Sequence, residues 1–309
     1  LGMAIKKRFG HDRLFVALEG HGREEILEDM DIARTVGWFT SVYPVQLDVS
    51  YADNPARQLK EIKETLRRIP NKGIGFGILK YLTNEKNKTD IQFKLQPQIS
   101  FNYLGQFDGD IKQISSFDIV EESVGNMQGL ANQREYLLDV GGMIAGNRLT
   151  MTVSYNEKHF KASSMAALAG DFQASLENLV EFCCSREKPA RTPGDFTYKG
   201  LSIESVDRLM ELYPDAEDIY TLTPMQEGML FHALADAASY SYFEQTSYRL
   251  RGELDIPLVE KSLNELLKRH DILRTVFVYK DIECPVQVVL KERTIDFYYR
   301  DISHIDDKE

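Results

Sequence analysis

Residues 14–24 read LFVALEGHGRE, an apolar run followed directly by charged residues and glycines. A short, fully apolar run is typical of a buried β-strand, and Gly20 and Gly22 predict that this strand ends in a turn. A carboxylate at such a strand end, here Glu19, can be partly desolvated, which raises its pKa and suits it to general acid or base chemistry. The flanking glycines would let a substrate approach the backbone closely. From these residues alone, a structural turn with solvated charges remains the alternative.

The segments that follow predict a mixture of strands and crossover helices over residues 1–185. We expect strands over 42–49 (broken near Pro44), 91–104, 135–140 and 148–155, the last two joined by a turn at Gly146-Asn147. We expect helices over 54–69, with Asn54 as N-cap and Pro55 at the first position, and over 164–182. In the first helix four apolar residues fall on one face, namely Leu59, Ile62, Leu66 and Ile69. The pattern is that of an α/β or α+β fold.

A change in composition marks a boundary after residue 185. Residues 186–199 are polar, contain Pro189 and Pro193, and show no apolar periodicity. They therefore predict a linker that cannot order itself. After it, Ser202 caps a short helix, and a capping box opens another helix at 223–226. A helix over 255–270 and β-rich segments over 272–299 complete the start of a second α/β unit.

The composition excludes several classes of protein. The 309 residues include 37 Lys and Arg against 48 Asp and Glu, a formal net charge of −11. A surface this acidic repels phosphate backbones and anionic lipids, so we expect neither nucleic acid nor a membrane as partner. Three cysteines form no even-numbered disulfide framework, which favours the reducing cytoplasm. We expect one of the adjacent Cys183 and Cys184 to be buried and the other to lie at the surface.

No known catalytic or cofactor motif fits in its proper context. GIGFG at 73–77 follows a helix instead of a strand, so it predicts a glycine turn or a close backbone approach and no dinucleotide site. The six histidines are scattered, without a pair at metal-ligand spacing. A Gly-x-Ser-x-Gly elbow is absent from the sequence. We therefore expect no metal and no directly bound cofactor.

Seven short strings occur together in a fixed order. EGHGRE at 19–24, RTVGWFT at 34–40, YP at 43–44, GIGFG at 73–77 and FNYLG at 101–105 together resemble the later core motifs of epimerization domains in bacterial nonribosomal peptide synthetases. LTPMQEGMLFH at 222–232 and RHDILRTVF at 269–277 resemble the opening of a condensation domain of the same enzymes. The resemblance covers nearly the whole chain.

The resemblance implies a fold of two lobes, each similar to chloramphenicol acetyltransferase, of the α/β (α+β) class. Residues 1–185 would be the C-terminal lobe of an epimerization domain, 186–215 an interdomain linker with a short helix, and 216–309 the N-terminal part of a condensation domain. The family's His-His-x-x-x-Asp-Gly motif would lie outside the sequence for both domains, since no two histidines are adjacent here. We therefore expect a part of a longer synthetase, incomplete at both ends and inactive alone.

The resemblance also assigns site residues. The epimerization domain inverts the α-carbon of an aminoacyl or peptidyl group that a neighbouring carrier domain holds as a thioester on phosphopantetheine. The matching positions make Glu19 one acid/base group, with Arg23 orienting it. Asn102 and Tyr103 would line the site and polarise the thioester carbonyl. His21 stays open between a structural and a site role.

The implied function is L-to-D epimerization followed by condensation with the next residue, in the biosynthesis of a peptide antibiotic or lipopeptide. Its partners would be peptidyl carrier domains and adjacent synthetase domains. One alternative is a non-catalytic piece that only docks those domains. Another is an acyltransferase of the same fold that is unrelated to peptides, which the strings at 34–40 and 101–105 disfavour.

Overall fold

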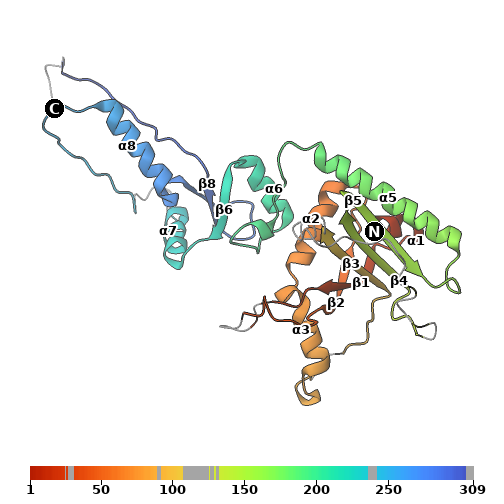
Figure 1. Cartoon of the computed structure of the whole chain (residues 1–309). Coiled ribbons are helices and arrows are strands. Elements are labelled where there is room, and N and C mark those ends of the chain that lie inside the picture. The colour runs from red at the N-terminus through yellow and green to blue at the C-terminus, as the bar shows by residue number, and fades with distance from the viewer. Residues whose placement is uncertain are drawn as a thin grey trace. The chain divides into compact units, whose positions relative to one another are not determined.

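The computed structural model of the chain describes residues 1–24, 26, 31–88, 92–106, 125, 129, 132–235 and 242–303. The chain divides into two compact units, Leu1–Lys188 and Pro189–Glu309. Their helices and strands carry the labels of Figure 1.

The first unit is built on a five-stranded mixed sheet in the order β2-β1-β3-β4-β5. Its strands are β1 (Arg13–Gly20), β2 (Ser41–Asp48), β3 (Ile99–Gln106), β4 (Leu138–Ala145) and β5 (Arg148–Tyr155). The central pairs β1–β3 and β3–β4 are parallel, and the outer pairs β1–β2 and β4–β5 are antiparallel. In a parallel pair, the C-terminal ends of both strands lie at the same edge of the sheet. β1 and β3 therefore end side by side.

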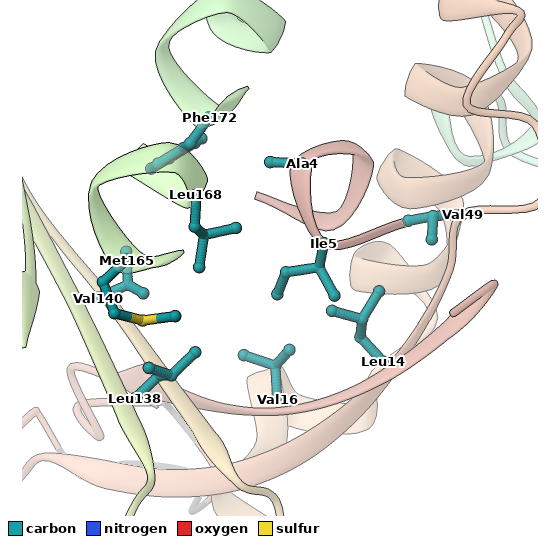
Figure 2. Close-up of a cluster of buried hydrophobic side chains, with 10 residues drawn as sticks. All are labelled: Ala4, Ile5, Leu14, Val16, Val49, Leu138, Val140, Met165, Leu168 and Phe172. Atoms are coloured by element: carbon teal, nitrogen blue, oxygen red, sulfur yellow. The ribbon is translucent and has the colours of Figure 1, made fainter. Parts of the chain in front are cut away.

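The core of this unit lies between the sheet and the helices α1 (Gly2–Phe9) and α5 (Ala162–Cys184). Figure 2 shows the side chains that converge there, among them Ile5 of α1, Val16 of β1, Val140 of β4 and Leu168 of α5. Successive strand residues point to opposite faces. Because Leu14, Val16 and Leu18 belong to this core, the residues that alternate with them, including Ala17 and Glu19, project from the other face.

Between β2 and β3 the chain forms a helical segment. It consists of α2 (Pro55–Arg67), the turn η1 (Pro70–Gly73), α3 (Ile74–Gly77), the turn η2 (Ile78–Leu82) and the turn η3 (Glu85–Asn87). Gly73 has φ +84°, and a Cβ there would lie 2.2 Å from the ring of Tyr43. Only glycine meets both conditions. Gly73 is thus a turn glycine with a close side-chain approach, whereas residues 74–77 of the glycine-rich string form helix α3 and not the expected turn.

The second unit has a three-stranded antiparallel sheet in the order β6-β8-β7. Its elements are the turn η4 (Pro193–Asp195), α6 (Ile203–Leu212), β6 (Ala216–Thr221), α7 (Pro224–Ala235), α8 (Ile256–Arg269), the turn η5 (Asp271–Arg274), β7 (Thr275–Val278) and β8 (Val286–Leu290). The core includes Val206 and Leu209 of α6 and Ile219 of β6 against three residues of the central strand β8, Val286, Val288 and Leu290.

The predicted helix starts are confirmed. Asn54 Oδ1 accepts a hydrogen bond from the backbone N–H of Arg57 at 3.1 Å, and Ser202 Oγ accepts one from Ser205 at 3.1 Å. At α7 the capping box is reciprocal. The backbone N–H of Thr223 donates to Gln226 Oε1 at 2.8 Å, and that of Gln226 donates to Thr223 Oγ1 at 3.3 Å. These local signals need no tertiary context, because each involves residues three positions apart.

Three strand predictions need correction. β2 runs unbroken through Pro44, which faces Ala17 of β1. It is an edge strand of the described sheet, where proline is tolerated best. The strand expected over 91–104 begins only at Ile99; residue 91 lies outside the described residues, and 92–97 form no strand. The strand expected from 135 begins at Leu138, and its hairpin turn has φ +56° at Gly146 and +62° at Asn147, as a two-residue turn requires.

Three packing predictions were also wrong. The segment 189–201 is not a linker without order, because Thr192, Phe196 and Leu201 are buried and the latter two belong to the second unit's core. Cys183 and Cys184 are both exposed. In α2 the buried residues are Gln58 and Glu64, whereas Leu66 of the predicted apolar face is exposed. Gln58 Nε2 donates to the carbonyl of Asp48 at 2.7 Å, which ties the helix to the end of β2 by a polar contact.

Candidate active site

The structure brings Glu19 and Asn102 together. In the parallel pair β1–β3, Leu18 is aligned with Phe101, so the next residue of each strand lies beside its neighbour on the sheet face away from the core. Asn102 Nδ2 donates a hydrogen bond of 2.6 Å to Glu19 Oε2. Eighty-three positions separate the two residues in the chain. The pairing of β1 with β3 therefore brings Glu19 and Asn102 into contact.

Glu19 is exposed in this chain, so the expected desolvation of its carboxylate is not found. The strand carries the side chain away from the apolar core instead of into it. The hydrogen bond from Asn102 occupies one carboxylate oxygen, Oε2, and leaves the other, Oε1, to exchange a proton. A carboxylate held in this way is oriented at its strand end and still reachable from solvent.

A polar network continues along the same sheet face. Ser100 Oγ donates to Asp139 Oδ1 at 2.7 Å. The guanidinium of Arg134 bonds to the other oxygen of Asp139 and to Ser154, whose Oγ and carbonyl oxygen lie at 3.0 Å. Together with Glu19 and Asn102, these residues line a cavity of about 570 Å³. Sequence reasoning missed this network. A signal exists in β3, where the polar Ser100 and Asn102 alternate with apolar residues.

Tyr136 lines the same cavity. Burial raises its pKa to about 12, and the nearby charges of Glu135, Asp139 and Glu19 act in the same direction. Each of these carboxylates disfavours a tyrosinate next to it. The phenol therefore stays protonated at neutral pH, and its hydroxyl is hydrogen-bonded to Glu135. No sequence motif pointed to this residue.

Tyr103 is placed differently from Asn102. It directly follows Asn102 in β3 and is aligned with Gly142 of β4. Because strand side chains alternate, it points to the opposite sheet face. Its side chain is 48% exposed. The structure thus does not bring Tyr103 to the Glu19–Asn102 pair.

Arg23 contacts a different part of the chain from the one expected. Its Nη1 donates to the carbonyl of Ile32 at 2.7 Å, and its Nη2 donates to that of Gly37 at 3.4 Å. Its guanidinium carbon lies 4.2 Å from the centre of the Phe39 ring. Within the described residues, Arg23 therefore holds the segment around 32–39 beside the end of β1, and it does not bond to Glu19.

His21 is part of the turn that follows the strand. Its Nδ1 accepts the backbone N–H of Arg23 at 3.0 Å, so in the neutral ring the proton sits on Nε2. That nitrogen lies 3.0 Å from Glu24 Oε1, and Lys72 Nζ lies 3.0 Å from Glu24 Oε2. The contact between His21 Nε2 and Glu24 Oε1 is short enough for an ion pair but does not have the geometry of a hydrogen bond. These contacts support a structural role for His21.

Gly22 is needed because the chain approaches itself here. Its φ is +66°, and a Cβ would lie 1.6 Å from the carbonyl oxygen of Phe39. The close approach at Gly22 is therefore made by the chain's own backbone at Phe39, whereas the sequence had suggested the approach of a substrate. The turn and the 32–39 segment form one packed corner at the end of β1.

Metal ligands and membrane-spanning helices were searched for over the described residues. Within these ranges, no cluster of three or more His, Cys, Asp or Glu side chains could hold a metal ion. Over the same part of the chain, no helix has the length and apolar character to cross a membrane.

The comparisons with known proteins identify the family. The condensation domain model matches residues 1–202 and 216–309, so the chain belongs to the condensation domain family. It is 43% identical to a mycosubtilin synthase polypeptide of Bacillus subtilis over 98% of its own length and 12% of that protein. It is 37% identical to bacitracin synthase 3 of Bacillus licheniformis over 95% of its length and 5% of that protein. The chain thus spans a small part of these relatives, which are bacterial nonribosomal peptide synthetases.

One solved structure is informative about the fold. The epimerization domain from the third module of tyrocidine synthetase B is 40% identical and superposes with a TM-score of 0.57, over 60% of this chain and 41% of that domain. The predicted fold class is therefore confirmed: the chain has the chloramphenicol-acetyltransferase-like α/β fold of condensation and epimerization domains.

Proposed function

We propose that residues 1–185 are the C-terminal lobe of an epimerization domain and that Glu19 is one of its two acid/base groups. The observation that carries the proposal is the 2.6 Å hydrogen bond from Asn102 to Glu19 at the adjoining ends of two parallel strands. The 40% identity to an epimerization domain supports it. The substrate is an aminoacyl or peptidyl thioester on the phosphopantetheine of a carrier domain.

The chemistry follows from the thioester, which acidifies the α-proton next to its carbonyl. Oε1 of Glu19 takes this proton, the C–H electron pair moves into the enolate, and a proton returned to the opposite face inverts the centre. The second acid/base group would come from the family's His-His-x-x-x-Asp-Gly motif, which this sequence lacks. Asn102 keeps Glu19 in one orientation.

We propose further that residues 216–309 are the N-terminal part of a following condensation domain, which takes the D-configured product as its donor. The match of the condensation domain model to these residues supports this assignment. The two parts would then act in succession on carrier-bound intermediates in the cytoplasm. Carrier domains and the neighbouring synthetase domains are the proposed partners, and phosphopantetheine is brought by the carrier.

The Glu19→Gln variant tests the epimerase proposal in the intact synthetase. The amide keeps the shape and the hydrogen bond from Asn102 but cannot exchange a proton, so we expect the rate of α-proton exchange with deuterated water to fall by about 10²–10⁴-fold. Affinity for the loaded carrier should stay nearly unchanged. Glu157→Gln, at an exposed position beyond β5, serves as the control. An undiminished exchange rate in Glu19→Gln would show that Glu19 is structural.

The exposure of Glu19 favours one alternative, a piece that docks carrier domains without catalysis. In that case Glu19→Gln would change neither exchange nor inversion, and chiral analysis of the released amino acid would show only the L form in every variant.

A further inference from the structure

A second cavity lies beside the Glu19 site, on the same side of the sheet. It has a volume of about 610 Å³ and is bordered by the start of β2, by α3 and η2, and by residues 95–97. Its wall is more apolar than polar, and its apolar residues include Val42, Phe76, Ile78, Leu82, Leu95 and Pro97. The volume falls in the range of ligand pockets, about 300–1,000 Å³, and so admits even an aromatic side chain.

The cavity is adjacent to the proposed catalytic group. Ala17 lines it and lies two residues before Glu19 on the same face of β1, a separation of about 7 Å along the strand. Glu135 and Tyr136 line both this cavity and the one that contains Glu19 and Asn102. A group bound at Glu19 could therefore extend a side chain past Tyr136 into the apolar space.

The charged groups around the cavity do not suit a charged guest. Lys80 lines the wall, and its Nζ lies 5.6 Å from the centre of the Phe76 ring and 5.0 Å from that of Tyr81. Its charge is thus already placed against aromatic faces. Glu135 lies at the border with the catalytic cavity and would repel an acidic side chain. An apolar guest meets neither penalty and is removed from water.

We propose that this cavity is a specificity site, which receives a large apolar or aromatic side chain of the residue whose α-carbon reacts at Glu19. The proposal rests on the proposed function for the reaction at Glu19. It predicts that the side chain contributes to substrate affinity through contacts with α3 and η2. A methyl side chain would leave most of the cavity empty.

Two glycines of α3 provide a matched pair of variants. Gly75 and Gly77 are both helical, and a Cβ at either position would meet nothing within 4 Å. Of the two, Gly77 lines the cavity and Gly75 does not. Leucine at either position favours the helix over glycine, so both variants should fold. Gly77→Leu places a side chain at the cavity wall, whereas Gly75→Leu adds the same group outside it.

The test measures binding of stable probes to the full chain by calorimetry. The probes are alanyl- and phenylalanyl-pantetheine with an amide in place of the thioester. We expect the phenylalanyl probe to bind at least about ten-fold more tightly than the alanyl probe. Gly77→Leu should remove this preference, and Gly75→Leu should keep it.

Three outcomes would overturn the proposal: no measurable binding of the phenylalanyl probe, equal affinity for the two probes, or the same effect from both leucine variants. Glu19→Gln should retain the preference, because it alters the proton-transfer group and not the cavity. If Glu19→Gln left α-proton exchange intact while Gly77→Leu removed the preference, the cavity assignment would stand and the epimerase proposal would fail.

Discussion

At the residue scale, the site depends on one side-chain pair and one half-buried phenol. The hydrogen bond from Asn102 occupies Oε2 of Glu19 and fixes the direction of the carboxylate. Arg23, expected to orient Glu19, instead bonds to carbonyls of the 32–39 segment. Orientation of the carboxylate is thus supplied by the neighbouring strand. An amide is suited to this role because it donates a hydrogen bond without adding a charge.

Tyr136 gives this site a measurable pH dependence. Its pKa is raised from 10.0 to about 12, so the folded state holds the phenol proton more tightly than the unfolded state does. The resulting stabilisation is complete below pH 10 and is lost as the pH rises through 12. We therefore expect the free energy of unfolding, measured by urea denaturation from about pH 9 to about pH 12, to fall less steeply in Tyr136→Phe than in the parent chain. Tyr81→Phe, at an exposed position, is the control, and identical slopes for Tyr136→Phe and the parent would contradict the assignment.

At the element scale, the position of the site is decided by how the core fills one face of the sheet. α1 and α5 bury the side chains at positions 14 and 16 of β1, and the side chain of Glu19 therefore projects from the opposite face. The pattern of β1 by itself, five apolar residues in a row, does not reveal which face each residue takes. Helix α5 decides it, because its Met165, Leu168 and Phe172 require an apolar surface to pack on.

The contribution of α5 can be tested at Leu168, which is completely buried. Leu168→Ala removes three buried carbons and leaves a cavity between α5 and the sheet, so we expect a loss of about 2–5 kcal/mol in the free energy of unfolding of the first unit. Val180→Ala, on the exposed side of the same helix, should change it by less than about 0.5 kcal/mol. Urea denaturation followed by far-ultraviolet circular dichroism distinguishes the two. A loss at Leu168 no larger than that at Val180 would show that α5 does not cover the core.

At the scale of the whole molecule, the chain divides into two units, and the boundary in the sequence lies between Lys188 and Pro189. The boundary lies close to the one that composition indicated at 185, but the polar segment after it belongs to the second unit. Thr192 and Phe196 are buried there, and Thr192 forms a capping box with Asp195. A segment with few apolar residues can still be ordered when some of them, here Phe196 and Leu201, are buried.

This boundary makes limited proteolysis selective within the segment 186–199. Trypsin should cut first at Arg186, which is exposed at the end of the first unit. Lys188 is protected by the following proline. Arg191 donates to the carbonyl of Glu217 at 3.1 Å and precedes the buried Thr192. Mass spectrometry should identify a fragment that ends at 186; Arg186→Gln should delay this cut and Arg191→Gln should not. An earlier cut at Arg191 or Lys199 would indicate a disordered linker.

The sequence by itself determined the local features and the family. Helix caps at Asn54, Ser202 and Thr223, the turn at Gly146-Asn147 and the ordered motifs each depend on residues close together in the chain, so their signals could be interpreted without a fold. Only the tertiary structure decided which distant residues meet. Asn102 reaches Glu19 because β3 pairs with β1, and Tyr103 faces away because side chains alternate along β3. The cavity behind Tyr136 exists because segments around positions 17, 43, 77, 96 and 136 converge. Contacts of this kind depend on strand pairing and on the burial of one sheet face, and both are properties of the folded chain.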